Sequence, residues 1–332
     1  IPIRRLAPAE AVTREPLGLV NGLKQFADGR VIVNDVARQR LVVFDPTLAT
    51  FTVTADSGGM GDTMYPRSSA AGGLYYYLGD SALFPDMTTL MFVMIGPDGR
   101  LGRAVAHPRP RDMGNIIQPL AGSPACDPQG RFIYRAAPRA IAAPLPGAAP
   151  IPWRARDSSA IVRADFDTRA VDTVARISLP IVPRTEVRRD VNGKPSATLL
   201  VNPVPLSPDE WAVLSDGSVA IVRAHDYHVD WVYPDGTRAS TPRMPYDWRR
   251  LTDDDKQARI DSVKRVIASL AATPRPYGSV ISRRTGQAKP DTVAPAIEFV
   301  PLAEMLDYIP PIRASTVKAD RDNHLWILPT TS

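Results

Sequence analysis

The sequence predicts an all-β protein built from several four-stranded antiparallel sheets. Three observations support this prediction: a strand–turn–strand unit recurs, its strands are apolar at successive positions, and its turns combine Asp with Gly or Asn. The chain has 332 residues, of which 44% are hydrophobic and 23% are charged, as is typical of a globular protein. It contains no run of about 18 apolar residues, so no transmembrane segment is predicted.

The repeated unit first occurs at 23–33, which reads LKQFADGRVIV. Its turn, Asp28–Gly29, precedes a strand rich in β-branched residues. Gly and Asn accept the positive φ of tight turns, and Val, Ile, Phe and Trp suit a pleated surface. The pattern recurs in further stretches, the first of them a less exact copy with Gly73 at the turn: 68–79, 123–134, 211–222 and 315–328.

Each unit continues into a third strand and then a more polar fourth strand. The third strands are predicted at 40–45, 89–99, 160–167 and 228–236. The fourth strands are predicted at 50–56, 101–108 and 170–178. The turns of successive units lie about 45 to 60 residues apart where no insertion intervenes, which is the spacing of propeller blades.

Both faces of these strands must be buried. A strand covered on one side alternates apolar and polar residues, whereas VIV, LVVF, LYYY and LMFVMI are continuously apolar. The connections are too short for the helical crossovers of a parallel sheet. Antiparallel sheets stacked face to face around an axis satisfy both observations, so the sequence predicts a β-propeller of four-stranded antiparallel blades.

The motif Asp-Gly-Arg-Val-Ile-Val at 28–33 has counterparts that end at Tyr134, Val222 and Leu328. In this pattern the chain resembles the six-bladed β-propellers of the NHL and TolB-like type, over about two-thirds of its length. The resemblance implies a six-bladed ring. Such propellers include lyases, lactonases, sugar-chain binders, protein scaffolds and periplasmic accessory proteins, so it implies the fold and no single function.

An N-terminal extension is predicted at 1–15, followed by a propeller domain over 16–332. Its blades are predicted at 16–60, 66–108, 119–180 and 196–242, with the opening half of another at 312–332. The ring is therefore incomplete at the C-terminus. Because a propeller must close to protect its edges, we expect either that the native chain continues beyond Ser332 or that 276–312 supplies irregular strands.

Three insertions interrupt the blades, and the first two are non-helical. The segment 137–157 is a loop rich in Pro and Ala. Its Trp153, with Arg154 and Arg156, is predicted to bind a partner; alternatively, Trp153 folds back onto the propeller. The segment 185–200 carries Asn192–Gly193 and is predicted to form a projecting hairpin.

The third insertion, 249–273, contains an amphipathic helix. Thr252 is the predicted N-cap and Asp255 completes a capping box, so the acidic triplet 253–255 is explained by capping and the helix dipole rather than by a metal. An apolar stripe is formed by Ile260, Val263, Ile267 and Leu270. This stripe docks on the propeller or binds a protein or membrane surface. The partner-binding candidates of the helix are Lys256, Arg259, Val263, Lys264 and Ile267.

The densest polar cluster is RAHDYHVD at 223–230. Its Asp226, His228 and Asp230 are weak candidates for metal ligands, because imidazole and carboxylate bind zinc or manganese. A hydrogen-bonded surface turn is the favoured alternative. The sequence contains no nucleophile elbow, metalloprotease motif, Walker loop or dinucleotide glycine pattern, so no catalytic residue is nominated and no cofactor is expected.

Missing catalytic motifs and three large insertions favour a non-catalytic interaction or scaffolding module over an enzyme. We expect it to be an exported or periplasmic bacterial protein, with its signal absent from this chain, that binds a protein partner such as a membrane-bound complex. The alternative is a ligand-binding or metal-dependent enzyme, similar to a lactonase or lyase, with its site at the axial mouth. The 40 basic and 35 acidic residues include no basic cluster interleaved with aromatics, which argues against nucleic-acid binding. The single cysteine, Cys126, excludes an internal disulfide.

Overall fold

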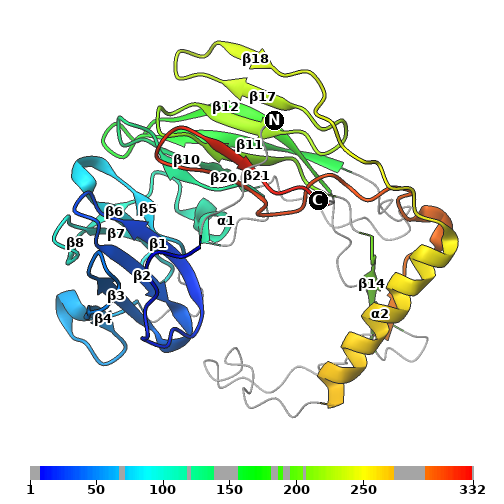
Figure 1. Ribbon diagram of the computed structural model, residues 1–332, viewed down its shortest axis with the longest axis horizontal. Coiled ribbons are helices and arrows are strands. Elements are labelled where there is room, and N and C mark those ends of the chain that lie inside the picture. Colours follow the sequence, from blue (N-terminus) through cyan, green and yellow to red (C-terminus); the bar gives the residue numbers. More distant parts are fainter. Residues whose placement is uncertain are drawn as a thin grey trace.

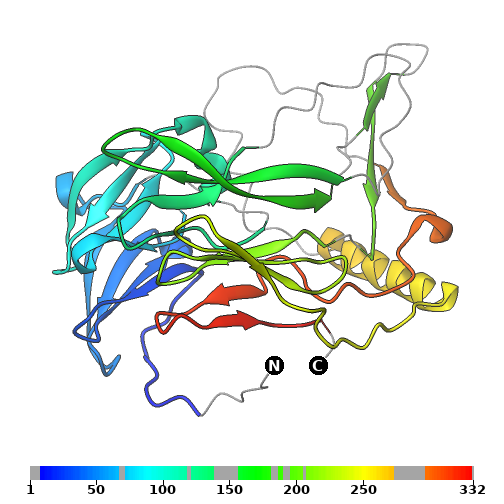
Figure 2. The same cartoon turned by 90° about the horizontal axis from the view of Figure 1, so that it is seen from above.

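A computed structural model describes residues 8–66, 72–117, 121–137, 156–180, 186–189, 195–204, 207–272 and 296–330. These residues form four sheets of four strands, one of three strands and one of two strands. Figures 1 and 2 show the sheets following one another in an arc around a common axis. The predicted β-propeller of four-stranded antiparallel blades is confirmed.

Each four-stranded sheet is one blade, in which consecutive strands pair in antiparallel order. Blade 1 contains β1 (Val20–Gln25), β2 (Val31–Asp35), β3 (Arg40–Phe44) and β4 (Phe51–Asp56). Blade 2 contains β5 (Tyr75–Tyr76), β6 (Ala82–Asp86), β7 (Met91–Ile95) and β8 (Leu101–Ala106).

The later blades follow the same order. Blade 3 contains β9 (Ala125–Cys126), β10 (Phe132–Arg135), β11 (Arg156–Ala164) and β12 (Val171–Pro180). Blade 4 contains β15 (Glu210–Val213), β16 (Val219–Val222), β17 (Val229–Val232) and β18 (Arg238–Ser240). Blade 5, in the described residues, is the pair β20 (Val317–Ala319) and β21 (Leu325–Ile327).

The turns between first and second strands use the predicted residues in four of the five blades. Gly29, Gly130, Gly217 and Asn323 all have positive φ, which explains why Gly or Asn occurs there. Blade 2 differs from the prediction. Its turn lies at Gly79, with φ of 62°, and Gly73 instead precedes β5.

Neighbouring blades pack face to face, so successive residues of one strand contact the blades on its two sides in turn. In blade 3, Phe132 packs against blade 2 and Ile133 against blade 4. In blade 4, Trp211 packs against blade 3 and Ala212 against blade 5. This double burial is the physical reason for the continuously apolar strands. Successive apolar cores therefore join blade 1 to 2, 2 to 3, 3 to 4 and 4 to 5.

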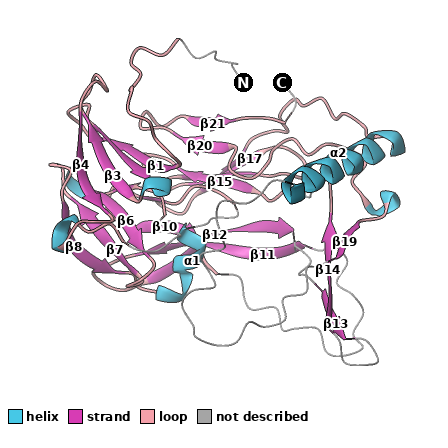
Figure 3. Cartoon of the chain, turned by 90° about the horizontal axis from the view of Figure 1, so that it is seen from below, coloured by secondary structure: helices cyan, strands magenta, loops and turns pink. Residues whose placement is uncertain are grey.

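The fourth predicted blade requires a correction, because 196–201 does not belong to it. This stretch lies in β14 (Pro195–Val201), which pairs with β13 (Glu186–Arg189) and runs parallel to β19 (Ala296–Phe299). The region 276–312 thus supplies a strand, although to this separate mixed sheet. Figure 3 shows the mixed sheet and the long helix to one side of the blades.

That helix is α2 (Asp253–Ala272), and its capping box is confirmed. The Asp255 main-chain N–H donates to Thr252 Oγ1 (3.2 Å), and the Thr252 N–H donates to Asp255 Oδ2 (3.0 Å). Ile260 does not pack on a blade as expected. It packs in a cluster formed by segments on either side of the helix: Val204, Leu251, Val300, Met305 and Ile309. The short helix α1 (Met113–Ile117) packs against β6 and β10.

Candidate functional site

The first strands of all five blades line one cavity of about 1640 Å³ at the axis of the arc. These strands are β1, β5, β9, β15 and β20. Leu23 in β1, for example, lines the cavity and is 58% exposed, because β1 is the inner edge strand of its sheet and pairs only with β2. The lining is mixed, with aromatic, aliphatic, hydroxyl and charged side chains. Such a concave surface with a few polar groups is the usual form of a small-molecule site.

One wall of the cavity is built around a buried lysine. Lys24, in β1, is fully buried, and its Nζ donates to the Asp80 carbonyl (2.6 Å) and to Asp80 Oδ1 (3.0 Å). The other carboxylate oxygen of Asp80 accepts from the Ala27 N–H (2.7 Å). Burial lowers the pKa of Lys24, and the contacts with Asp80 oppose that effect. The pair joins blades 1 and 2 directly beside the cavity.

The aromatic ring of Tyr76 lies next to this pair. Its hydroxyl accepts from the Gln25 N–H (3.1 Å), which holds β5 against β1. Lys24 Nζ lies 5.2 Å from the ring centroid, and the Arg321 guanidinium carbon lies at the same distance. These are favourable cation–π distances. Arg321 comes from the turn after β20, so the three side chains bring blades 1, 2 and 5 together.

A second part of the lining contains Ser123 and Lys318. Lys318 Nζ donates to Ser123 Oγ (2.9 Å), and both residues line the cavity. Glu210 lies behind them, fully buried, with Oε2 accepting from the Gly122 N–H (3.2 Å). Burial raises the pKa of Glu210 to about 7, against the lowering effects of the Gly122 and Ser315 N–H groups and of Lys318. A group that titrates near neutral pH therefore lies directly behind the cavity wall.

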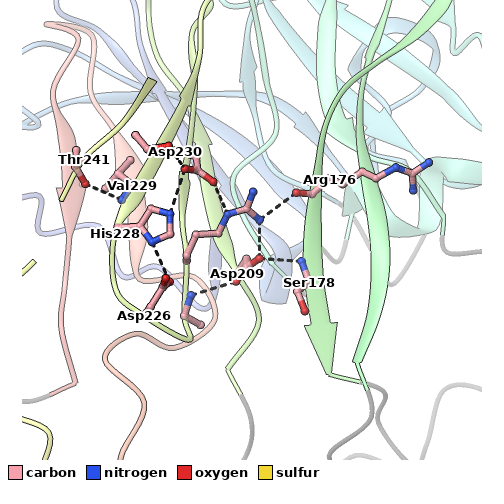
Figure 4. Close-up of polar contacts among 11 residues, drawn as sticks. Arg176, Ser178, Asp209, Asp226, His228, Val229, Asp230 and Thr241 are labelled. Carbon is pink, nitrogen blue, oxygen red and sulfur yellow. Dashed lines mark hydrogen bonds and ion pairs between the residues drawn. The ribbon is translucent and has the colours of Figure 1, made fainter. Parts of the chain in front are cut away.

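The structure brings together the weak metal candidates Asp226, His228 and Asp230, but in a hydrogen-bonded network (Figure 4). His228 Nδ1 lies 2.9 Å from Asp226 Oδ1, and Nε2 lies 3.2 Å from Asp230 Oδ1. Both ring nitrogens thus face carboxylates, and neither is left to bind a metal. Arg223 joins Asp230 to Asp209 (2.7 and 2.8 Å). The network ties blade 4 to blade 3 through Arg176 and Ser178.

Among the described residues, one group of three could bring metal-ligating atoms within 4.8 Å of one another: Asp320, Asp322 and His324. It lies in the turn between β20 and β21. Asp320 already accepts hydrogen bonds from the Trp326 indole N–H (2.7 Å) and from the main-chain N–H of Asp322 and His324. Burial acts to raise the pKa of Asp320, but these donors prevail and hold it at about 2. The cluster is explained as a turn and supports no metal assignment.

The partner-binding candidates of α2 differ in exposure. The prediction that Lys256 binds a partner requires a correction, because Lys256 is buried. Its Nζ donates to Asp307 Oδ1 (2.8 Å) and to the Leu302 carbonyl (3.2 Å). This lysine holds α2 against the segment that contains Leu302 and Asp307, because its long side chain reaches both residues. Lys264 is exposed, whereas Arg259, Val263 and Ile267 are half-buried.

The Pro/Ala-rich loop contains the other three candidates. Trp153 and Arg154 lie outside the described residues, and Arg156 is the first residue of β11. The expected partner and the periplasmic location stay predictions. No helix in the described part of the chain is long and apolar enough to span a bilayer.

Sequence reasoning missed the polar residues that line the cavity, Tyr76, Asp80, Lys318 and Arg321, and the buried Lys24 beside them. A partial signal was present, because Asn21, Gln25 and Lys318 are polar residues of first strands and line the cavity. It was not general, since all four residues of β15 are buried.

Comparison with known proteins found no matching family model and no matching curated protein. Solved structures do match. One is an inactive virginiamycin B lyase from Staphylococcus aureus with quinupristin, at 11% identity over 69% of this chain and 71% of that chain, with a TM-score of 0.34. Another is a nidogen/laminin complex, at 14% identity over 68% and 66%, with a TM-score of 0.34. A third is a gluconolactonase from Xanthomonas campestris, at 12% identity over 70% and 78%, with a TM-score of 0.30.

The four-stranded antiparallel blades confirm the predicted resemblance to β-propellers. The matched structures are mostly named as lyases and lactonases, so the expectation that the protein is more an interaction module than an enzyme finds no support in them. At identities of 11 to 14%, no activity, ligand or residue role is carried over to this chain.

Proposed function

We propose that the axial cavity binds a small molecule and that this molecule is the substrate of the protein. The observation that carries the proposal is the convergence of five first strands on one cavity of about 1640 Å³. Small-molecule sites usually enclose about 300–1,000 Å³, so there is room for a substrate together with water. The scaffold holding the site is rigid, because apolar cores join the blades on either side of each of β5, β9 and β15.

The chemistry of the lining supports an enzymatic site. It offers hydroxyl, phenol, amine and guanidinium groups within one concave surface, in Ser123, Tyr76, Lys318 and Arg321. Apolar side chains such as Leu23 and Leu214 lie among them and suit the carbon skeleton of a ligand. Orientation by a few polar groups in a largely apolar cavity is the arrangement by which enzymes position substrates.

Filling the cavity tests the binding part of the proposal. Leu23→Trp adds bulk at an exposed lining position, whereas Leu328→Trp makes the same change at a position 66% exposed outside the lining. We expect ligand-observed NMR to find fragments that bind wild type and Leu328→Trp at millimolar concentration but not Leu23→Trp. Equal binding to all three proteins, or no bound fragment, would contradict the proposal.

Turnover is tested with the same variants. We expect mass spectrometry of a bacterial metabolite extract to show at least one compound that wild type and Leu328→Trp consume and that Leu23→Trp leaves unchanged. The physical reason is that bulk in the cavity displaces the substrate from its position against the polar groups. Identical extracts after incubation with wild type and Leu23→Trp would argue against an enzyme acting at this cavity.

A further inference from the structure

The two cations that line the axial cavity, Lys318 and Arg321, form no direct ion pair with a carboxylate in the described part of the chain. Lys318 is exposed, and its Nζ contacts the neutral Ser123 hydroxyl. Arg321 is exposed, lies over the Tyr76 ring, and Nη1 makes one long hydrogen bond to the Gln25 carbonyl (3.4 Å). Most N–H donors of these two side chains are therefore available to a ligand.

The carboxylates of the lining are, in contrast, already occupied. Both oxygens of Asp80 accept hydrogen bonds, from Lys24 and from the Ala27 N–H. Asp127 is paired with Arg131 (2.8 Å) and accepts main-chain N–H groups of its own turn. Asp320 accepts from the indole of Trp326 and from its own turn. The acidic side chains of the lining thus have protein donors. The two exposed cations make no direct contact with a carboxylate, although the charge of Arg321 acts on Asp80 and that of Lys318 on Glu210.

A third positive charge lies near Arg321. The buried ammonium of Lys24 is close enough that the charge of Arg321 contributes to lowering the Lys24 pKa. Asp80, in contact with Lys24, and more weakly Asp28 act against this repulsion. An anion placed at the mouth of the cavity would relieve that repulsion and would hydrogen-bond to the free guanidinium donors.

We propose that the cavity ligand is an anionic organic molecule whose carboxylate or phosphate group is bound by Arg321 and Lys318. This inference rests on the proposed function and deepens it by naming the chemical class of the ligand. The planar guanidinium suits either oxyanion in a bidentate contact, and the Lys318 ammonium adds a second, flexible donor group. Tyr76 and Leu23, which also line the cavity, would contact the uncharged part of the ligand.

The experiment measures binding of inorganic phosphate and of citrate by isothermal titration calorimetry, with glycerol as a neutral control and sodium chloride holding the ionic strength constant. The phosphate and citrate arms distinguish the two oxyanions. The variants are Arg321→Met and Lys318→Met, and Arg100→Met is the control because Arg100 is exposed in a turn outside the lining. Thermal melting of each variant verifies that it is folded.

We expect at least one of the two anions to bind wild type and Arg100→Met equally. Its Kd should rise about tenfold in Arg321→Met and in Lys318→Met, as loss of one charge-assisted contact predicts. Saturable binding that is unchanged in both variants would overturn the inference. The inference would also be overturned if neither anion binds although fragments bind wild type and not Leu23→Trp. In that second case the cavity would remain a ligand site, whereas failure of fragments and anions alike would overturn the proposed function as well.

Discussion

Two charged side chains that are buried at the junctions between blades contact a neighbouring segment. Lys24 of blade 1 meets Asp80 of blade 2, and Glu210 of blade 4 meets the Gly122 N–H that precedes blade 3. Burying an unpaired charge would cost several kcal/mol, so these contacts define which blades lie side by side. Ion pairs at such positions give specificity to the packing more than they give stability.

At this scale, Glu210→Gln is expected to change how stability depends on pH. The folded pKa of about 7 lies above the unfolded value, so the folded state binds the proton more tightly. The stabilisation is present at pH 5 and is lost as the pH rises through about 7. The free energy of unfolding of wild type should therefore fall by about 2.5 kcal/mol more between pH 5 and pH 8 than that of Glu210→Gln.

Urea unfolding at the two pH values measures this difference. The matched control is Glu298→Gln, because Glu298 is an exposed residue of β19. Its pH dependence should follow that of wild type. Parallel stability profiles for wild type and Glu210→Gln would show that burial does not shift the titration of this carboxyl.

The elements divide into two groups that are stabilised in different ways. The short blade strands have two to ten residues and depend on packing against both neighbouring blades. The helix α2 contacts other segments through few residues, and Val266 on its outer face is 55% exposed. Local features such as its capping box therefore contribute a larger share of the stability of this element.

Removal of the cap tests this difference. Thr252→Ala deletes the hydroxyl that accepts from the Asp255 N–H, and we expect the N-terminal turn of α2 to lose about 1 kcal/mol of local stability. Asp254→Asn is the control, since Asp254 is an exposed first-turn residue outside the capping box. Hydrogen exchange measured by mass spectrometry should show faster exchange of α2 peptides in Thr252→Ala, with blade peptides unchanged. Equal exchange in wild type and Thr252→Ala would contradict this role.

Over the described residues, the blades form a continuous series of apolar cores, and polar contacts link the first blade to the fifth. The outer face of blade 1 is covered in part by Leu17, from the segment that precedes β1. Blade 5 reaches blade 1 through the hydrogen bond from Arg321 to Gln25. Because blades 1 and 5 meet through polar side chains, the axial cavity is lined there with donors and acceptors, which a binding site requires.

Because each blade supports the next, loss of one core residue should weaken the whole arc. Ile221 is 1% exposed in the core between blades 3 and 4. We expect Ile221→Ala to lower the free energy of unfolding by about 2–5 kcal/mol. The control Ile297→Ala, at a position 38% exposed in the mixed sheet, should cost well under half of that value in the same urea titration. Similar losses for the two variants would show that the arc is not one cooperative unit.

The repeating units could be predicted because their signals are local. Gly29 and Gly217 mark turns that need positive φ, and Thr252 with Asp255 marks the start of a helix within one turn of chain. The continuously apolar strands required burial on both faces and so predicted face-to-face blades. Local signals failed at Gly73, because two adjacent glycines can each be placed in a turn.

The amino-acid sequence by itself thus determined the strands, their turns, the capped helix and the stacking of blades. Only the tertiary structure decided that β14 pairs with β19, that Lys256 is buried, and which side chains form the cavity. Lys24 and Asp80 are 56 residues apart in the chain, and Ser123 and Lys318 are 195 apart. Contacts at such separations depend on how the blades are placed around the axis, and no periodicity of neighbouring residues encodes that placement.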